Sequence, residues 1–341
     1  MTSPPIQWYP GHIAKAERSL LEQLKKVDVV LEVRDARIPL ATQHPQIGQW
    51  LANKEHALVM NRMDMIPVRL QQSWRTWFEQ QGEVAYFTDA NHGKGIEAVA
   101  KAAQVLGEKM NQRRRDRGML PRPVRAVVIG FPNVGKSALI NRLLKRRVVE
   151  SARRPGVTRQ LRWIRISPEL ELLDAPGILP SKLNNQAAAL KLAICDDIGE
   201  AAYDNQRVAS AFIDLWKQLA DTVPALMGNG LETRYGLSPS EVTGESYLAL
   251  LSERRYQNDT ERAARQLLND FRKGLLGNVP LELPPLELPP LELPSWEAIA
   301  TDRESPVPDS EIDPVEAAIA ADQESPESDP EGDPVAEAVE S

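Results

Sequence analysis

The stretch GFPNVGKS, residues 130–137, decides the fold. It follows the apolar run VRAVVIG and precedes the helical sequence ALINRLLK, which is the strand–loop–helix setting of a phosphate-binding loop. Gly130 and Gly135 would let backbone N–H groups wrap a β-phosphate at a helix N-terminus. Lys136 would reach the β- and γ-phosphates, and the Ser137 hydroxyl would bind Mg²⁺. The stretch therefore predicts a nucleoside triphosphate site rather than an incidental glycine-rich turn.

Two later segments are expected to complete the magnesium site. LLDAPG (172–177) ends an apolar run with Asp174, which would hold Mg²⁺ through water, and with Gly177, whose N–H would meet the γ-phosphate. RRPGVTRQ (153–160) offers Thr158, which would join the Mg²⁺ shell once a γ-phosphate is bound. D-x-P-G alone is also a common turn, but its spacing from Ser137 fits a helix, a loop and a strand.

The predicted base is guanine. Its adjacent N1–H and N2–H₂ groups are two donors that one carboxylate can accept from, and the sequence supplies a carboxylate at a suitable place. NRMD (61–64) ends an apolar run and supplies Asp64, while TDA (88–90) follows the next run and would bring a backbone N–H near O6. Asn61 is expected to bridge neighbouring loops and to face the base. The predicted contacts to the nucleotide are Asn61, Arg62, Met63, Asp64, Thr88, Asp89, Ala90, Asn133, Val134, Gly135, Lys136, Ser137, Ala138, Thr158 and Gly177.

The apolar runs predict an α/β fold followed by helices. Strands are expected at 27–35, 56–61, 83–88, 124–130, 161–167 and 170–176, with helices at 66–81 and 93–112 between them. This alternation is typical of a mostly parallel sheet covered on both faces. From about residue 183 to 277 apolar residues recur at helical spacing without strand runs, which predicts a small all-helical domain with Trp216 in its core.

These segments resemble the five GTPase boxes in the order fourth, fifth, first, second, third, as in circularly permuted GTPases. WYPGHIAKAE (8–17), DARIP (35–39) and LLNDFRKGLLGN (267–278) are similar to the ribosome biogenesis GTPase A family of the YlqF type. The resemblance covers about residues 6–283. It implies GTP/GDP and Mg²⁺ as ligands, GTP hydrolysis, and binding to a precursor of the large ribosomal subunit and its 23S rRNA. The domains expected are an N-terminal arm (1–25), a circularly permuted P-loop GTPase domain (26–182), a helical RNA-binding domain (183–279) and a disordered acidic tail (280–341).

Three positions depart from or extend this pattern. Arg62 stands where the family usually has lysine, and its stem is expected to pack by the base in the same way. Ile178 stands where many GTPases place a glutamine that orients the attacking water, so the resemblance points to His12 of WYPGH as the catalytic residue. Asn133 matches the position by which related GTPases coordinate K⁺. A plain surface histidine and a plain loop asparagine are the alternatives.

Charge is divided between body and tail. Residues 279–341 contain 18 acidic side chains and one basic one, a net of −17, so the total of −7 leaves +10 for residues 1–278. A body of this charge suits a polyanion such as RNA. The basic linker 112–125 and the late helical segments are expected either to contact phosphates or to be solvated. The tail repeats PLELP three times and is rich in Pro and Glu, which predicts disorder; it is either a solvated tail or an internal mimic of nucleic acid.

Several classes of protein are excluded by composition. One cysteine, Cys195, rules out a disulfide framework or a Cys-rich zinc site, which also disfavours a small-subunit factor among the permuted GTPases. No apolar run approaches the ~20 residues of a membrane span. A cytoplasmic monomer with no DNA or membrane partner is expected. A GTP-gated RNA-binding module with negligible turnover and an ATP-dependent kinase remain as alternatives to a GTPase.

Overall fold

The structure is a computed structural model. It describes Ile6 and residues 13–51, 54–145, 162–174, 180, 185–199 and 203–285, all within one compact unit that comprises residues 1–285. Five predicted features fall outside the described residues: His12, Thr158, Gly177, Ile178 and the tail from residue 286 onward.

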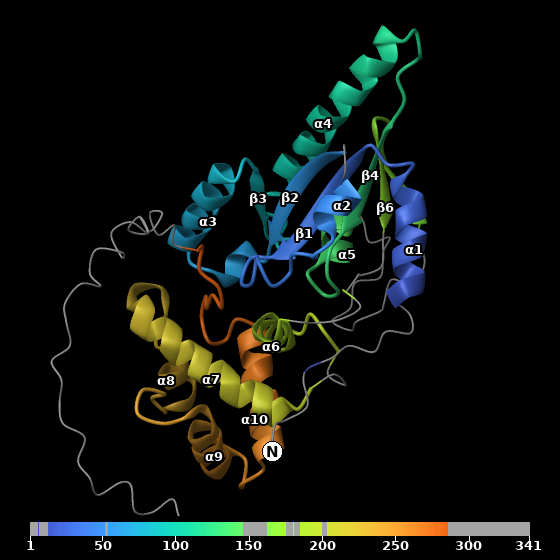
Figure 1. The fold of residues 1–341 in the computed structure, drawn as a ribbon. Helices are drawn as coiled ribbons and strands as arrows, with labels where there is room; N and C mark the ends of the chain where they lie inside the picture. Colours follow the sequence, from blue (N-terminus) through green and yellow to red (C-terminus); the bar gives the residue numbers. More distant parts are fainter. Residues whose placement is uncertain are drawn as a thin grey trace, which may run out of the picture. The chain divides into compact units, whose positions relative to one another are not determined.

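A six-stranded sheet lies at the centre of the first half of this unit (Figure 1). Its strands are β1 (Val29–Asp35), β2 (Glu55–Asn61), β3 (Ala85–Thr88), β4 (Val124–Ile129), β5 (Arg162–Ser167) and β6 (Leu170–Asp174). They run in the order β3-β2-β1-β4-β6-β5, and only β5 is antiparallel to its neighbour. The mostly parallel sheet is confirmed, with β1 and β3 beginning two residues later than predicted.

Successive side chains of a strand point to opposite faces of the sheet, so the buried residues form separate clusters on the two faces. Val29, Leu31 and Val33 of β1 belong to the cluster that includes α4 (Ile96–Asp116) and α5 (Lys136–Leu143). Val30 points to the other face, where α1 (Ile13–Leu24) and α2 (Ile47–Leu51) cover it. The third helix of that face is α3 (Val68–Gln80), which packs Trp74 and Phe78 against Leu58 and Met60 of β2. Burial on both sides explains why these strands are nearly continuous apolar runs.

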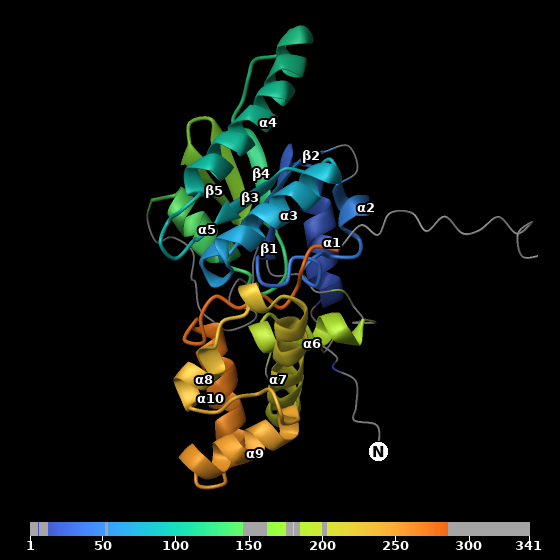
Figure 2. The same cartoon turned by 90° about the vertical axis from the view of Figure 1, so that its left-hand side faces the viewer.

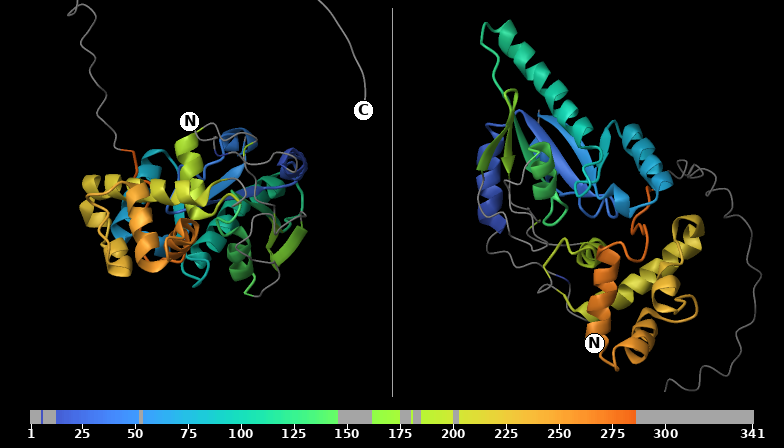
Figure 3. Two further views of the ribbon diagram at one scale, coloured as in Figure 1. Left: turned by 90° about the horizontal axis from the view of Figure 1, so that it is seen from below. Right: turned by 180° about the vertical axis from the view of Figure 1, so that it is seen from behind.

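Helix α4 is longer than predicted. The segment 112–125 was expected to be a linker, but residues 112–116 form the last turn of α4. The run QRRRD contains good helix formers and no glycine or proline, so its charge alone did not end the helix. With 21 residues and a rise of about 1.5 Å each, α4 extends well beyond the sheet (Figures 1 and 3).

The described residues from 185 to 285 form helices and no strand, as predicted. They are α6 (Gln186–Cys195), α7 (Asn205–Thr222), the 3₁₀ turn η4 (Pro224–Leu226), α8 (Gly230–Tyr235), α9 (Gly244–Arg255) and α10 (Thr260–Arg272). Asn185, Asp204, Thr243 and Asp259 each accept a hydrogen bond from a backbone N–H in the first turn of the following helix. Helices α7, α9 and α10 pack together around Phe212 and Phe271, whose rings lie 4.8 Å apart (Figure 2).

The predicted beginning of the disordered tail, residue 280, is too early. Leu281 and Glu282 are buried, and the Glu282 carboxylate accepts hydrogen bonds from the backbone N–H groups of Leu40 and Ala41. The Pro- and Glu-rich composition predicts a solvated segment. Glu282 is buried instead because backbone N–H groups replace the water that would otherwise hydrogen-bond its carboxylate. The first PLELP repeat is therefore part of the fold.

Candidate nucleotide-binding site

The loop 130–135 connects β4 to α5 and depends on its two glycines. Gly130 (φ +150°) lies so close to β1 that a Cβ there would be 2.2 Å from the carbonyl oxygen of Val33. Gly135 (φ +101°) is the N-cap of α5, and a Cβ there would be 2.0 Å from Nδ2 of Asn61. The loop can follow this path only without side chains at those two points.

Lys136 supplies a positive charge at the start of α5. The side chain is buried, and its ammonium donates hydrogen bonds to the carbonyl oxygens of Gly130 (3.1 Å) and Phe131 (2.7 Å). Together with the N–H groups at the N-terminus of α5, this charge makes the loop a site for an anion such as a phosphate.

Asn61 joins the three loops that the sequence predicted to meet. Its Nδ2 donates to the carbonyl oxygen of Val134 (2.8 Å) in the phosphate-binding loop. Its Oδ1 accepts from Oγ1 of Thr88 (3.2 Å) and from the N–H of Ala90 (3.1 Å). The predicted bridge is present, and it uses both ends of the amide to fix the ends of β2, β3 and β4 relative to one another.

Asp64 offers a carboxylate oxygen that needs a donor. It lies in the 3₁₀ turn η2 (Met63–Met65), and its buried Oδ1 has no hydrogen-bond partner among the described residues. Burial, and then the neighbouring charge of Asp89, raise the pKa of Asp64. A buried acceptor of this kind fits a ligand that brings N–H groups, as guanine does.

Asp64, Asp89 and His92 also come near one another. One possible ligand atom of each lies within 4.8 Å of the others, so the three could in principle hold a cation. Asp89, however, already accepts hydrogen bonds from the N–H groups of Asn91 and His92 and contacts the His92 ring at 2.7 Å. Only Asp64 of the three retains an oxygen without a partner among the described residues, which favours the base over a metal.

The guanidinium of Arg62 makes contacts that the sequence did not predict. Arg62 adopts a left-handed backbone (φ +63°) and donates from Nη1 to Asp35 (2.9 Å) and from Nη2 to the carbonyl oxygen of Asn133. Its guanidinium thus connects the NRMD segment to the phosphate-binding loop and to the DARIP segment. Packing of its stem by the base stays a prediction.

The C-terminal end of α6 is contacted by three different elements. The carbonyl oxygen of Asp196 accepts from Nδ2 of Asn133 (2.6 Å), and that of Cys195 accepts from Arg37 (3.3 Å). Arg272 of α10 donates to the carbonyl oxygens of Ile194 and Ala193, both at 2.9 Å. The last carbonyls of a helix lack donors within the helix, so these side chains tie α6 to the phosphate-binding loop, to the loop after β1 and to α10.

The strand ends also bring two of the three predicted magnesium ligands, Ser137 and Asp174, to one end of the sheet. Asp174 ends β6 and pairs in register with Val128 of β4, the strand that leads into the phosphate-binding loop and Ser137. A hydroxyl and a carboxylate are oxygen donors of the kind that Mg²⁺ prefers, so these residues fit the ion.

Comparison with known proteins agrees with this geometry. Residues 125–223 match the family described as "50S ribosome-binding GTPase". The chain is 35% identical over 286 residues to a ribosome biogenesis GTPase A of Bacillus cereus, covering 82% of this chain and 94% of that protein. It is 30% identical to mitochondrial ribosome-associated GTPase 1 of Bos taurus, with 81% and 88% covered.

The chain belongs to the ribosome biogenesis GTPase A family. Its fold is also that of GDP-bound TM YlqF, with a TM-score of 0.57, 22% identity, and 78% of this chain and 99% of that chain covered. The resemblance to permuted GTPases is confirmed, and this member of the family is an enzyme that hydrolyses GTP. In the part of the chain that the structure describes, no helix has the length and apolarity to cross a bilayer.

The sequence did not predict a cluster of buried charged side chains near the end of α6. Asp35 and Arg37 are fully buried and paired at 2.7 Å, and Asp197 is fully buried with no hydrogen-bond partner for either oxygen among the described residues. Burial raises the pKa of Asp35, but Arg37 and Arg62 outweigh it and the pKa is lowered. For Asp197, burial and then the charge of Asp35 raise the pKa to about 8. DARIP was noticed as a motif, but nothing in it signals its partners on α6.

Asp197→Asn should remove a pH dependence of stability. Because the pKa of Asp197 is about 8 in the folded protein against 3.8 for a free side chain, the folded state binds a proton that the unfolded chain has lost. The free energy of unfolding of the wild type should therefore fall as pH rises from about 4 to about 8 and then level off. Urea unfolding at about pH 5, 7 and 9 should show the variant gaining on the wild type over this interval. A difference that does not vary with pH would contradict this account.

Gly135→Ala should weaken GTP binding by roughly tenfold or more, about 1.4 kcal/mol. The new Cβ would meet Nδ2 of Asn61, which cannot move without breaking its bonds to Val134, Thr88 and Ala90. Isothermal titration with GTP measures the effect, and Gly82→Ala is a matched control because that glycine also has positive φ but open space around it. Equal affinity of the two variants would rule out the clash with Asn61.

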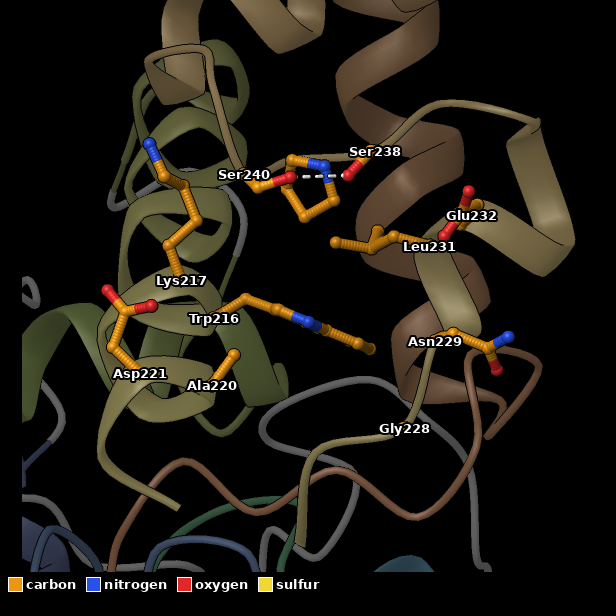
Figure 4. Close-up of a pocket in the computed structure, with 11 residues that line it drawn as sticks. Trp216, Lys217, Ala220, Asp221, Gly228, Asn229, Leu231, Glu232, Ser238 and Ser240 are labelled. Atoms are coloured by element: carbon orange, nitrogen blue, oxygen red, sulfur yellow. Dashed lines mark hydrogen bonds between the residues drawn. The ribbon is translucent and has the colours of Figure 1, made fainter. Parts of the chain in front are cut away.

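A separate pocket of about 200 Å³ lies among the helices (Figure 4). The buried indole of Trp216 extends from α7 toward α8, and the hydroxyls of Ser238 and Ser240 hydrogen-bond to each other at 2.6 Å. Trp216 also packs edge-on against Phe212 at 5.8 Å, which confirms its predicted place in the core. No catalytic residue set lines this pocket.

Proposed function

We propose that this GTPase uses GTP binding and hydrolysis to time a late step in assembly of the large (50S) ribosomal subunit, through contact with the subunit precursor and its 23S rRNA. The observation that carries the proposal is the set of hydrogen bonds at the end of α6. Through them Asn133, next to the nucleotide phosphates, and Arg272, on α10, contact consecutive parts of the same helix end. A change at the phosphates can thus reach the helices by a path of direct contacts.

Within the proposal, the nucleotide contacts are those expected from the sequence. Asn61, Arg62, Met63, Asp64, Thr88, Asp89 and Ala90 would serve the guanosine half, and Asn133, Val134, Gly135, Lys136, Ser137, Ala138, Thr158 and Gly177 the phosphates. Mg²⁺, held by Ser137, Thr158 and Asp174, would supply positive charge beside the β- and γ-phosphates. K⁺ beside Asn133 is part of the same proposal, and would use Oδ1 because Nδ2 already donates to Asp196.

Exposure favours some arginines over others for contact with rRNA. At the end of α4, Arg113, Arg115 and Arg117 are exposed. Arg122, paired with Asp28 at 2.8 Å, and Arg125, paired with Glu171 at 3.4 Å, are only partly exposed. Among the helices, Arg272 is likewise committed to α6. We therefore assign phosphate contact to the end of α4 and to Arg254, Arg255, Arg262, Arg265 and Lys273.

The proposal is tested by fractionating cell extract with either GTP or a non-hydrolysable analogue. We expect the protein to sediment with large-subunit particles in the presence of the analogue and to be released with GTP. Migration with small subunits, or no dependence on the nucleotide, would overturn the proposal.

His12→Ala should leave GTP binding intact and slow turnover stimulated by large subunits by more than about tenfold. Ile178 cannot hydrogen-bond the attacking water, so another group must position it, a kind of contribution typically worth 10²–10⁴ in rate. Single-turnover hydrolysis with purified large subunits measures the change. Unchanged turnover would remove His12 from the mechanism.

A GTP-gated RNA-binding module with negligible turnover is the second candidate, and Ile178 is the observation in its favour. Turnover measured with and without large subunits separates the two functions. Stimulation by subunits supports the timing role, and its absence supports the module.

A further inference from the structure

The residues that hold the first PLELP repeat form a defined site, which we name the PLELP clamp. It consists of Arg37, Leu40, Ala41 and Lys191. The carboxylate of Glu282 accepts from the N–H groups of Leu40 (2.7 Å) and Ala41 (3.2 Å) and from Nζ of Lys191 (3.1 Å). This set of donors recognises a carboxylate.

The residues beside the glutamate are also held by the clamp and by the core around it. The N–H of Leu281 donates to the carbonyl oxygen of Arg37 at 3.0 Å, and the Leu281 side chain is 1% exposed. Pro280 is buried, and Leu283 packs partly buried against two core clusters. Four of the five residues of the repeat, 280–283, are thus buried or partly buried, and two of them also form hydrogen bonds with the clamp.

The same five residues occur twice more in direct succession. PLELP stands at 280–284, 285–289 and 290–294. The copies differ only in the residues that flank them: Val279, which is 2% exposed, precedes the first and a proline precedes each of the others, while Ser295 follows the third and a proline follows each of the others. Burial of Val279 favours the first copy, but everything that the clamp contacts inside the repeat is present in all three.

We propose that the PLELP clamp is a binding site for the motif itself and that the second copy, residues 285–289, exchanges with the first. The ligand class is a short acidic–apolar peptide flanked by prolines. The prolines restrict the free chain, so less conformational entropy is lost when a copy binds.

Exchange would lengthen the connection between α10 and the clamp. Replacing the first copy by the second adds five residues, or up to about 16 Å of extended chain. The clamp is built from the loop after β1 and from Lys191 of α6, so the extra length would loosen the tether between α10 and those two elements. The repeat would thus adjust the freedom of α10, whatever α10 binds, and the inference does not depend on the proposed ribosomal role.

Crosslinking tests the exchange directly in the full chain. Cysteines at Lys191 and Pro289 should be joined by a short bismaleimide, more slowly than cysteines at Lys191 and Pro284, the equivalent position of the copy that occupies the clamp. Both pairs keep Glu282 and Glu287, and the backbone N–H groups of Leu40 and Ala41 still bind the carboxylate. The native Cys195 is 1% exposed and does not compete. Adding Leu286→Ala and Leu288→Ala to the Lys191–Pro289 pair keeps the tether but removes the apolar contacts. We expect at least about a tenfold fall in crosslinking rate, about 1.4 kcal/mol; an unchanged rate would mean simple proximity and would overturn the proposal.

Charge reversal provides a second test. Glu282→Lys should lower the thermal midpoint by less than half as much as E282K/E287K/E292K, because the second copy can replace the first. E287K/E292K, which keeps Glu282, should match the wild type. Equal losses in the single and triple variants would show that no other copy enters the clamp, and GTP titration confirms that each variant is folded.

Discussion

Asp64→Asn should lower the affinity for GTP by about 10²–10³-fold and give a preference for xanthosine triphosphate. The carboxylate would accept from both N1–H and N2–H₂ of guanine, and two hydrogen bonds to a charged group are together worth roughly 3–4 kcal/mol. An asparagine amide cannot accept both. Xanthine carries a carbonyl where guanine carries the amine, so the new N–H₂ group would donate to it. Competition titrations with the two triphosphates measure the inversion.

Asp89→Asn is the matched control for this experiment. It makes the same chemical change on the neighbouring loop, whose proposed contact with the base is a backbone N–H, while the carboxylate oxygens of Asp89 already have donors in Asn91 and His92. We expect this variant to keep its preference for GTP. If Asp64→Asn also kept it, the carboxylate would not face the base and the assignment of NRMD would be wrong.

The parts of the site predicted from sequence are those that follow from strand ends. Asn61 lies at the end of β2, next to β3 in a parallel sheet, so its contact with Thr88 and Ala90 follows from topology alone. The phosphate-binding loop is equally local, because its glycines and Lys136 are consecutive along the chain.

The contacts that escaped prediction are those between residues far apart in sequence. The guanidinium of Arg62 turns to Asp35, 27 positions away, because a buried carboxylate there needs a second positive charge. The clamp around Glu282 joins residues 242 positions apart. The composition of that segment predicts disorder. Because the three repeats are identical, no local pattern shows that the glutamate of one of them accepts hydrogen bonds from the folded body.

Arg37→Met should lower the free energy of unfolding by about 3–5 kcal/mol, the usual cost of removing one partner of a buried ion pair. The substitution would leave Asp35 fully buried with only Arg62 as a counter-charge, and it would remove the hydrogen bond to Cys195 and the contact with the Phe271 ring at 5.1 Å. Urea unfolding measures the loss.

The second expected effect of Arg37→Met is uncoupling, and Arg34→Met separates it from instability. Arg34 also forms a buried ion pair on β1, with Glu32 at 2.7 Å, and among the described residues its hydrogen bonds go to Glu32 and not to α6. In the wild type and in Arg34→Met, a non-hydrolysable GTP analogue should slow amide hydrogen exchange in the last turn of α6 and in α10. In Arg37→Met that protection should be reduced, because the hydrogen bond from Arg37 is one of the three described links to the C-terminal end of α6. The links through Arg62 and Asn133 and through Arg272 remain. Full protection in Arg37→Met would mean that the nucleotide acts on α10 by another path.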